Sequence, residues 1–516
     1  MLSKIFSAAL TGLEAVPIEV EVDVSGGLHA FNIVGLPDNA IRESKDRVSS
    51  AIKNIGAQTP ARANRRITIN LAPADFKKEG SYYDLAIALG YLLASQQIKN
   101  FETKDKIFIG ELALDGQLRP VNGVLAIAEL AEKTPTINYL FLPWENASEA
   151  ALINKRVKVI GIKYLKELIE HLEEIRIIPA VSSSFSLKGE NKGTGENWRQ
   201  VKGQYLAKRA LIIAAAGGHN LLFIGPPGSG KTMLAKALID ILPVLTLEEA
   251  LEITRIYSIA GLLAKKEPLI KKRPFRNPHH TASAVALVGG GSEPKPGEIS
   301  LAHRGVLFLD ELPEFNRSVL ETLRQPLEDG CITISRSQGS LTFPSRFTLV
   351  AAMNPCPCGF LNDPLKECQC SAGDILKYRR KISGPLLDRI DMQVEVPRLN
   401  YEKIKSQEET NICQVQEQIE LARQIQKERF KNYQSLRSIF TNAEMEPKDI
   451  ERFCSLKEDG EKLMKKAVDS YGLSVRSYHR ILKLSRTIAD LESSSQIKIE
   501  HLSEALRYKT GFDWES

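Results

Sequence analysis

The clearest chemistry in this chain lies in eight consecutive residues that are rich in glycine and end in lysine and threonine. These residues are Gly225, Pro226, Pro227, Gly228, Ser229, Gly230, Lys231 and Thr232. Glycines at this spacing let backbone N–H groups converge on phosphate oxygens, the lysine reaches the outer phosphates, and the threonine hydroxyl can ligate Mg²⁺. The segment therefore predicts a P-loop with ATP and Mg²⁺ as cofactors.

The residues on either side of this loop supply the context that the motif needs. Residues 220–224 are mostly apolar and predict a buried parallel strand, and residues 233–242 predict the helix that follows. The glycines then fall at a strand-to-helix turn. The alternative is a turn rich in glycine and proline that carries Gly-Lys-Thr by chance, and the flanking strand and helix disfavour it.

A second apolar run, at residues 305–309, ends in the acids Asp310 and Glu311. This is a Walker B pattern, in which Asp310 would hold Mg²⁺ through water and Glu311 would orient the attacking water. Phosphoryl transfer needs such positioning and charge neutralisation more than covalent chemistry. An apolar strand ending in two acids is often structural, but its place downstream of a P-loop favours the catalytic interpretation.

A third strand is predicted at residues 347–353, with Asn354 at its C-terminal tip. Open α/β sheets bind their ligands at this edge, so the amide could contact the γ-phosphate or the attacking water. The alternative is a turn asparagine that precedes Pro355.

Four of the seven cysteines cluster in one loop as Cys356, Cys358, Cys368 and Cys370. Four thiolates in one loop fit a structural Zn²⁺ site, although the spacing within each pair is tighter than usual. Reduced cysteines that only pack are the alternative. An odd cysteine total disfavours a disulfide framework and favours a reducing, cytoplasmic compartment.

Residues 331–335 and 340–343 predict a β-hairpin with Arg336 near its tip, preceded by one helix over residues 316–328. A basic tip could grip the DNA backbone without reading bases. The alternative is a hairpin that packs against a neighbour and leaves Arg336 solvated.

The whole chain has 516 residues and a net charge of +6, a mild excess that permits a nucleic-acid partner without arguing for it. No stretch approaches the ~18 apolar residues of a membrane span, so we expect no membrane partner. Strands and helices alternate, which predicts an α/β protein. We expect four parts: an α/β domain at 1–175, a polar linker at 176–197, a nucleotide-binding core at 198–400 and a helical lid at 401–516.

Several longer strings in this chain resemble the ComM (YifB) family of magnesium-chelatase-like AAA+ ATPases. The resemblance covers nearly the whole chain and rests on the two nucleotide motifs and on residues 275–281, 297–303 and 383–391. It implies a P-loop AAA+ core with a helical lid. It also implies a hexameric DNA motor that promotes branch migration during natural transformation, with recombination proteins as possible partners.

The same resemblance assigns roles to three polar residues. Asn354 would be the first sensor, Arg389 the arginine finger presented to a neighbouring subunit, and Arg476 the second sensor of the lid. Pairing of Arg389 with Asp388 or Asp391 is the alternative. For the basic stripe that includes Arg480 and Lys483 we expect a solvated helix face.

The N-terminal domain resembles the Lon protease fold through residues 79–84 and 110–120. Lon-type catalysis needs a serine activated by a lysine. In this chain Tyr82 stands where the serine belongs, and Leu125 or Ile127 where the lysine belongs, so we expect a domain without peptidase activity. The open alternative is that Ser81 uses another base.

The nucleotide motifs predict an ATPase, and the family resemblance implies a ring-forming homo-oligomer that moves along single-stranded or branched DNA. A chelatase-like motor that remodels a protein partner is the second hypothesis, and an ATP-dependent protease is the third. The missing Ser-Lys pair counts against the third.

Overall fold

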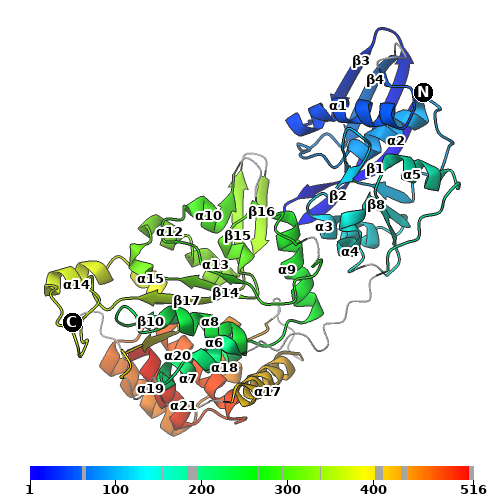
Figure 1. The fold of residues 1–516 in the computed structure, drawn as a ribbon. Coiled ribbons are helices and arrows are strands. Elements are labelled where there is room, and N and C mark those ends of the chain that lie inside the picture. The colour runs from blue at the N-terminus through cyan, green and yellow to red at the C-terminus, as the bar shows by residue number, and fades with distance from the viewer. Residues whose placement is uncertain are drawn as a thin grey trace. The chain divides into compact units, whose positions relative to one another are not determined.

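A computed structural model describes residues 1–60, 65–153, 155–182, 195–264, 267–291, 295–336, 339–400, 411–431 and 439–510. Figure 1 shows the fold, which divides into two compact units. The first unit comprises Met1–Leu187, Leu247–Ile270 and Thr333–Phe343, and the second comprises Lys188–Thr246, Lys271–Ile332 and Pro344–Ser516. Residues 183–194 of the predicted linker lie outside the described part of the chain. The domain boundaries at 175, 197 and 400 stay predictions.

The first unit is built on a four-stranded sheet in the order β1-β2-β4-β3. Side chains in β2 alternate between buried and partly exposed, as expected for a sheet with one face on the core. Helices α1 and α2 both contribute side chains to the core that this sheet forms. The bounds are β1 (Leu2–Thr11), β2 (Glu14–Gly26), β3 (Ala30–Val34), β4 (Arg65–Ala72), α1 (Asn39–Asn54) and α2 (Asp84–Ala94).

The rest of the first unit combines a parallel sheet in the order β5-β8-β9, the strand pair β6-β7 and four helices. One of these helices, α9, comes from the middle of the chain and is joined to this unit by a hydrogen bond from Ser258 Oγ to Glu149 Oε1 of 2.5 Å. The bounds are β5 (Lys106–Phe108), β6 (Glu111–Leu112), β7 (Leu118–Arg119), β8 (Tyr139–Pro143), β9 (Lys158–Ile162), α3 (Val124–Lys133), α4 (Trp144–Ala150), α5 (Leu165–Leu172) and α9 (Leu247–Ile259).

The second unit contains a five-stranded sheet in the order β11-β14-β17-β10-β18, with every pairing parallel. Strands β10, β14 and β17 are buried along their whole length. This is the continuous apolar pattern of strands covered on both faces. The bounds are β10 (Leu221–Ile224), β11 (Phe275–Arg276), β14 (Val306–Leu309), β17 (Thr348–Met353) and β18 (Met392–Glu395).

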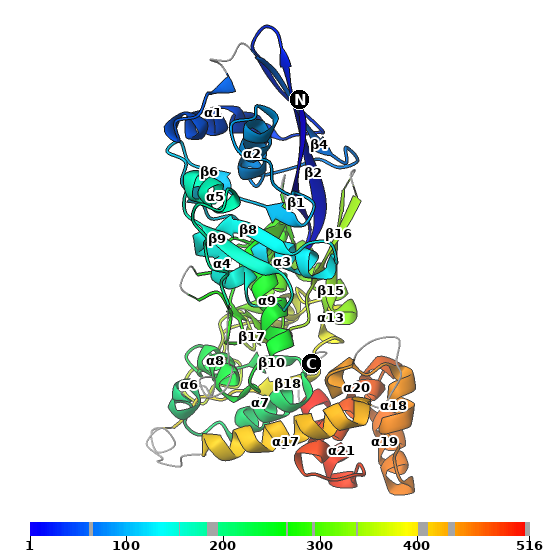
Figure 2. The same ribbon diagram turned by 90° about the vertical axis from the view of Figure 1, so that its right-hand side faces the viewer.

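Helices cover this sheet and continue into an all-helical C-terminal part (Figure 2). Side chains of the sheet and of the C-terminal helices belong to one hydrophobic core, which includes Phe223, Phe308, Leu484 and Tyr508. The bounds are α6 (Glu196–Gln200), α7 (Tyr205–Gly217), α8 (Lys231–Ile241), α14 (Ala372–Arg379), α15 (Gly384–Leu387), α17 (Ile412–Lys431), α18 (Pro447–Phe453), α19 (Glu458–Tyr471), α20 (Val475–Leu491) and α21 (Ile499–Thr510).

The single helix expected over residues 316–328 is wrong in one respect, because the structure has two short helices, α12 (Arg317–Glu321) and α13 (Arg324–Asp329). Pro326 has no amide hydrogen to donate to the carbonyl of Thr322, and its ring clashes with that carbonyl in a continuous helix. The helix is therefore interrupted one turn before the proline.

The expected hairpin is present as a two-stranded sheet of β15 (Cys331–Arg336) and β16 (Gly339–Pro344). Residues 337–338 and the side chain of Arg336 lie outside the described part of the structure. Within the described residues, no helix combines the length and apolarity needed to cross a membrane.

A buried polar network holds the C-terminal helices together around Asp490, whose side chain is fully buried. Its carboxylate accepts hydrogen bonds from Arg429 at 2.8 Å, Asn442 at 2.8 Å and Arg486 at 3.1 Å. The single carboxylate of Asp490 thus compensates the positive charges of two guanidinium groups. Removing one member of a buried charge network leaves the other charges without compensation.

We expect Asp490→Ala to lower the free energy of unfolding by about 3–5 kcal/mol, because Arg429 and Arg486 would stay buried without their acid. Denaturant unfolding measures this change. Asp469→Ala removes an exposed acid from α19 and is the matched control, with an expected change within about 0.5 kcal/mol. Equal stability of the two variants would contradict the role of the network.

Candidate nucleotide-binding site

The predicted P-loop lies between β10 and α8, as its flanking pattern indicated. Gly228 and Gly230 have φ angles of 75° and 92°, in the left-handed region that favours glycine. At Gly225 an added Cβ atom would lie 2.2 Å from the carbonyl oxygen of Val396. The glycines are therefore required by backbone geometry, and the loop leads into the N-terminus of an eleven-residue helix, where the first amide groups have no carbonyl partner within the helix.

The ammonium of Lys231 lies over this loop and contacts oxygen atoms. Its Nζ donates to the carbonyl oxygens of Gly225 at 2.7 Å and Pro226 at 3.0 Å, and to Asn354 Oδ1 at 3.2 Å. Burial lowers the pKa of Lys231, while Asp310 and Glu311 act in the opposite direction. Ser229 Oγ is buried without a hydrogen-bond partner among the described residues. A phosphate oxygen would give Ser229 Oγ a partner, and the Lys231 ammonium supplies positive charge beside it, so the residues fit a nucleotide.

The side chains predicted to hold Mg²⁺ are brought together across the sheet. Thr232 Oγ1 donates to Asp310 Oδ2 at 2.9 Å, although the two residues are 78 positions apart. The strand order β14-β17-β10 produces this contact, because it aligns the carboxyl ends of all three strands at one edge. A hydroxyl and a carboxylate in contact are the ligand types that Mg²⁺ prefers.

Glu311 adopts an unusual backbone conformation, with φ 52° and ψ 46°. A left-handed conformation at a residue other than glycine costs free energy and clusters at functional sites. The Glu311 carboxylate is 57% exposed, and its Oε2 lies 3.3 Å from Nδ1 of His280. Residues 275–281 contributed to the family resemblance, but the sequence pattern did not predict that His280 contacts Glu311. The only signal was its position just after β11, at the edge of the sheet where β14 also ends.

Arg389 and Arg476 both approach the carboxylate of Glu328. Arg389 is 7% exposed and donates to Glu328 and to the carbonyl oxygen of Pro385 at 2.6 Å. Arg476 is exposed and lies 3.7 Å from Glu328. Hydrogen bonding from Arg389 lowers the pKa of Glu328. Sequence reasoning did not single out Glu328, since only the fold brings helix α20 and the residues just after α15 to this position on α13.

The alternative pairing of Arg389 with its near neighbours is not what the structure has. Asp391 instead lies 3.5 Å from Arg480 and 3.6 Å from His219. The expectation of a solvated face for Arg480 and Lys483 is wrong. Arg480 pairs with the buried carboxylate of Asp391. Lys483 Nζ donates to the carbonyl oxygen of Ala443 at 2.9 Å, and burial of the Lys483 side chain lowers its pKa.

The four clustered cysteines lie together in space, all as free thiols. Their Sγ atoms fall within 4.8 Å of one another. Gly359, which follows Cys358, packs so closely on the P-loop that an added Cβ atom would be 2.7 Å from Pro227 Cδ and 3.7 Å from Asn354 Cγ. The cysteine loop therefore touches the nucleotide site directly.

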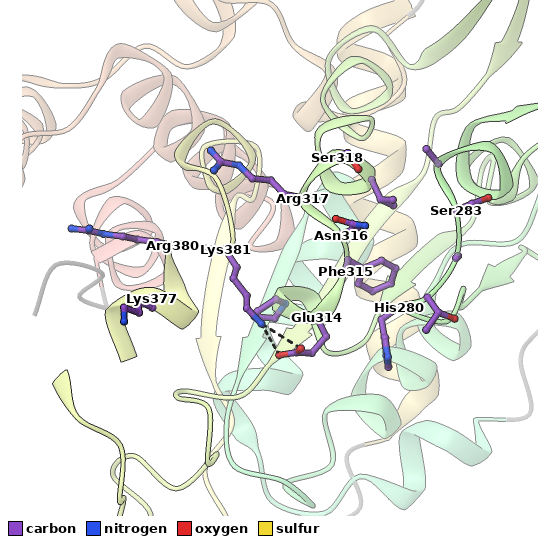
Figure 3. Close-up of a pocket in the computed structure, with 15 residues that line it drawn as sticks. His280, Ser283, Glu314, Phe315, Asn316, Arg317, Ser318, Lys377, Arg380 and Lys381 are labelled. Atoms are coloured by element: carbon purple, nitrogen blue, oxygen red, sulfur yellow. Dashed lines mark hydrogen bonds and ion pairs between the residues drawn. The ribbon is translucent and has the colours of Figure 1, made fainter. Parts of the chain in front are cut away.

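A pocket of about 970 Å³ opens beside the Walker B strand (Figure 3). Its acidic lining residue, Glu314, is 3.3 Å from Lys381. Figure 3 shows Lys377, Arg380 and Lys381 on one side and His280 with Phe315 on the other. Four basic side chains line the pocket: Arg317, Lys377, Arg380 and Lys381. An excess of positive charge in a hollow of this size suits an anionic partner.

The N-terminal unit has no Ser-Lys pair at the expected protease positions within the described residues. Ser81 Oγ donates to the carboxylate of Glu111. Leu125 and Ile127 are buried in the core. Lys78, a lysine close in sequence, is fully buried, and its Nζ donates to the carbonyl oxygen of Phe76 at 3.0 Å.

Comparison with known families assigns most of the chain. Residues 197–404 match the family described as "Magnesium chelatase, subunit ChlI", residues 20–146 match "Subunit ChlI of Mg-chelatase", and residues 409–509 match "Magnesium chelatase, subunit ChlI C-terminal". The chain also shows 26% identity to Lon protease 2 of Bacillus subtilis, over 34% of this chain and 33% of that protein.

Two relatives are similar over almost their whole length. The chain is 44% identical to competence protein ComM of Haemophilus influenzae, which covers 98% of this chain and 97% of that protein. It is 42% identical to the protein YifB of Salmonella typhimurium, with the same coverage. These matches confirm the predicted fold class, an α/β protein with a P-loop AAA+ core and helical lid preceded by a Lon-protease-like domain. The chain belongs to the ComM (YifB) family of magnesium-chelatase-like AAA+ ATPases.

Proposed function

We propose that this chain is an ATP-driven DNA motor of the helicase or branch-migration type, acting in DNA recombination during natural transformation. The observation that carries the proposal is the convergence of Lys231, Thr232, Asp310 and Asn354 at the carboxyl ends of three parallel strands. Family membership implies ATPase activity with ATP and Mg²⁺. The near full-length similarity to a competence protein supports the DNA role.

The P-loop amides and Lys231 would hold the nucleotide phosphates, and Thr232 with Asp310 would hold Mg²⁺, which neutralises the phosphate charge when bound. To receive phosphate oxygens, the Lys231 ammonium exchanges its carbonyl partners for them. Glu311 would orient the attacking water, and for this its carboxylate must leave His280. Asn354 already contacts Lys231 and would contribute a further polar group beside the γ-phosphate.

Arg389 would act as the arginine finger toward a neighbouring subunit, and Arg476 as the second sensor of the lid. Both are engaged by Glu328 in the isolated chain. An arginine supplied across an interface stabilises the charge of the transferring phosphoryl group, so hydrolysis would depend on ring assembly. We propose a homo-oligomeric, hexameric ring that works in the cytoplasm, with recombination proteins as further partners.

The DNA backbone would contact two basic features, Arg336 of the hairpin and the basic pocket of Figure 3. Basic side chains can contact backbone phosphates without reading bases, which suits a translocating motor. The second candidate is a chelatase-like motor that remodels a protein, and the chelatase family matches favour it. Stimulation of the ATPase by single-stranded, duplex or branched DNA separates the two candidates.

We expect Lys231→Ala to abolish nucleotide binding, because the phosphates would lack the buried ammonium of the loop. Glu311→Gln should keep binding and lose turnover, since the amide cannot polarise water. A fluorescent ATP analogue measures binding, and phosphate release measures turnover. Hydrolysis by Glu311→Gln at the parental rate would show that the Walker B assignment is wrong.

Arg389→Ala should keep ATP binding and lower turnover by about 10³-fold or more. Mixing this variant with Lys231→Ala should restore part of the activity, because an intact arginine then faces an intact P-loop at some interfaces. As the matched control, a chain that carries both Lys231→Ala and Arg389→Ala is mixed with the Arg389→Ala variant. This mixture should recover no activity, because neither chain supplies an intact arginine. Absence of recovery in rings shown to be mixed would contradict action in trans.

Arg336→Ala should reduce the stimulation of ATPase activity by DNA and weaken DNA binding about equally across sequences. The slope of log affinity against log salt should flatten by about one unit for each phosphate group that the variant no longer neutralises. Lys465→Ala, at an exposed position on α19, is the control and should match the parent. An unchanged salt slope in Arg336→Ala would mean that the hairpin does not touch DNA, and the protein-remodelling candidate would then be preferred.

A further inference from the structure

The four cysteines of the loop after β17 have the geometry of a closed metal site. Cys356 Sγ lies 3.4 Å from Cys358 Sγ and 3.6 Å from Cys368 Sγ, and Cys358 Sγ lies 3.6 Å from Cys368 Sγ. A tetrahedral zinc ion with sulfur ligands at about 2.3 Å places those sulfurs about 3.8 Å apart. The thiols are thus already close to the separation that zinc requires, and they are well beyond the ~2.05 Å of a disulfide.

Backbone amides support these sulfur atoms. The amide of Cys358 donates to Cys370 Sγ at 3.4 Å, and the amide of Leu361 donates to Cys356 Sγ at 3.3 Å. Such hydrogen bonds orient thiolate ligands and stabilise their negative charge. Four soft sulfur donors without a free coordination position favour structural zinc over Mg²⁺ or Ca²⁺.

The loop is also tied to the nucleotide site at two points. Asn354, at the end of β17, is separated from Cys356 by one residue. Gly359, at φ 84°, lies against Pro227 of the P-loop with no room for a Cβ atom. A loop of fixed shape would therefore hold both Asn354 and the P-loop in place, whereas a loose loop would hold neither.

We propose that Cys356, Cys358, Cys368 and Cys370 bind one structural zinc ion, and that the closed loop braces the P-loop through the contact between Gly359 and Pro227. The brace rests on the proposed function only insofar as the P-loop binds ATP. It predicts that zinc content and ATP affinity are linked, although the four cysteines are not among the residues proposed to hold the nucleotide phosphates.

The first test measures zinc by mass spectrometry and ATP affinity with a fluorescent analogue in the full-length protein. The parent should hold about one zinc per chain. Gly359→Ala should keep its zinc and bind the analogue about tenfold more weakly, because the added methyl group displaces Pro227. Gly56→Ala is the matched control: its φ of 86° gives a backbone strain similar to that at Gly359, but the space around the added Cβ atom is open, so its ATP affinity should equal that of the parent.

The second test removes the metal. Cys356→Ser with Cys358→Ser should lose zinc and weaken analogue binding at least as much as Gly359→Ala. Since this variant could fail to fold, the parent is also stripped with a chelator, and its affinity should fall and then recover with added Zn²⁺ but not with added Mg²⁺. A purified protein without zinc, or with iron in its place, would overturn the metal assignment.

The brace and the nucleotide site fail in different ways. If zinc removal and Gly359→Ala leave analogue binding unchanged while Lys231→Ala abolishes it, the brace is wrong and the nucleotide site stands. If Lys231→Ala binds the analogue like the parent, the nucleotide site itself is wrong.

Discussion

The hydrogen bond between Thr232 and Asp310 depends on the strand order of the parallel sheet, and the rest of the site depends on the same constraint. Strand β17 lies between β10 and β14, so the P-loop and the Walker B acids are separated by one strand rather than adjacent. Asn354 directly follows that middle strand, and its Oδ1 accepts a hydrogen bond from Lys231, which lies after β10. One sheet edge thus brings together three segments that are far apart in the sequence.

The two arginines near Glu328 impose a second constraint. The Glu328 carboxylate holds a buried guanidinium and approaches an exposed one. If Arg389 serves a neighbouring subunit, it must exchange this acid for the neighbour's phosphates, so assembly competes with an internal ion pair. The ion pair with Glu328 would then add to the free-energy cost of presenting Arg389 to a neighbouring subunit.

Local patterns predicted the elements of the site well. The apolar runs before Gly225, Asp310 and Asn354 became buried strands because their strong hydrophobicity agrees with their tertiary position. The prediction of a single helix over residues 316–328 was wrong because it overlooked Pro326, which interrupts the hydrogen-bond ladder.

Contacts between distant residues could not be predicted in the same way. His280 reaches Glu311, and Glu328 reaches Arg389 across 61 positions. No spacing rule connects such pairs, because the topology of the sheet decides which side chains meet. The interpretation of Arg480 and Lys483 as solvated failed for a related reason: periodicity identifies the faces of a helix but does not show what covers them.

The hydrophobic core that the sheet shares with the C-terminal helices limits how the lid can respond to nucleotide. Phe223 and Phe308 of the sheet belong to the same core as Leu484 of α20 and Tyr508 of α21. A wide hinge opening would expose this apolar surface to water, at a cost of roughly 25 cal/mol for each Å². Small sliding movements of packed helices keep the surface buried. Arg476, at the start of α20, would therefore shift by shear, over a short distance and together with its whole helix.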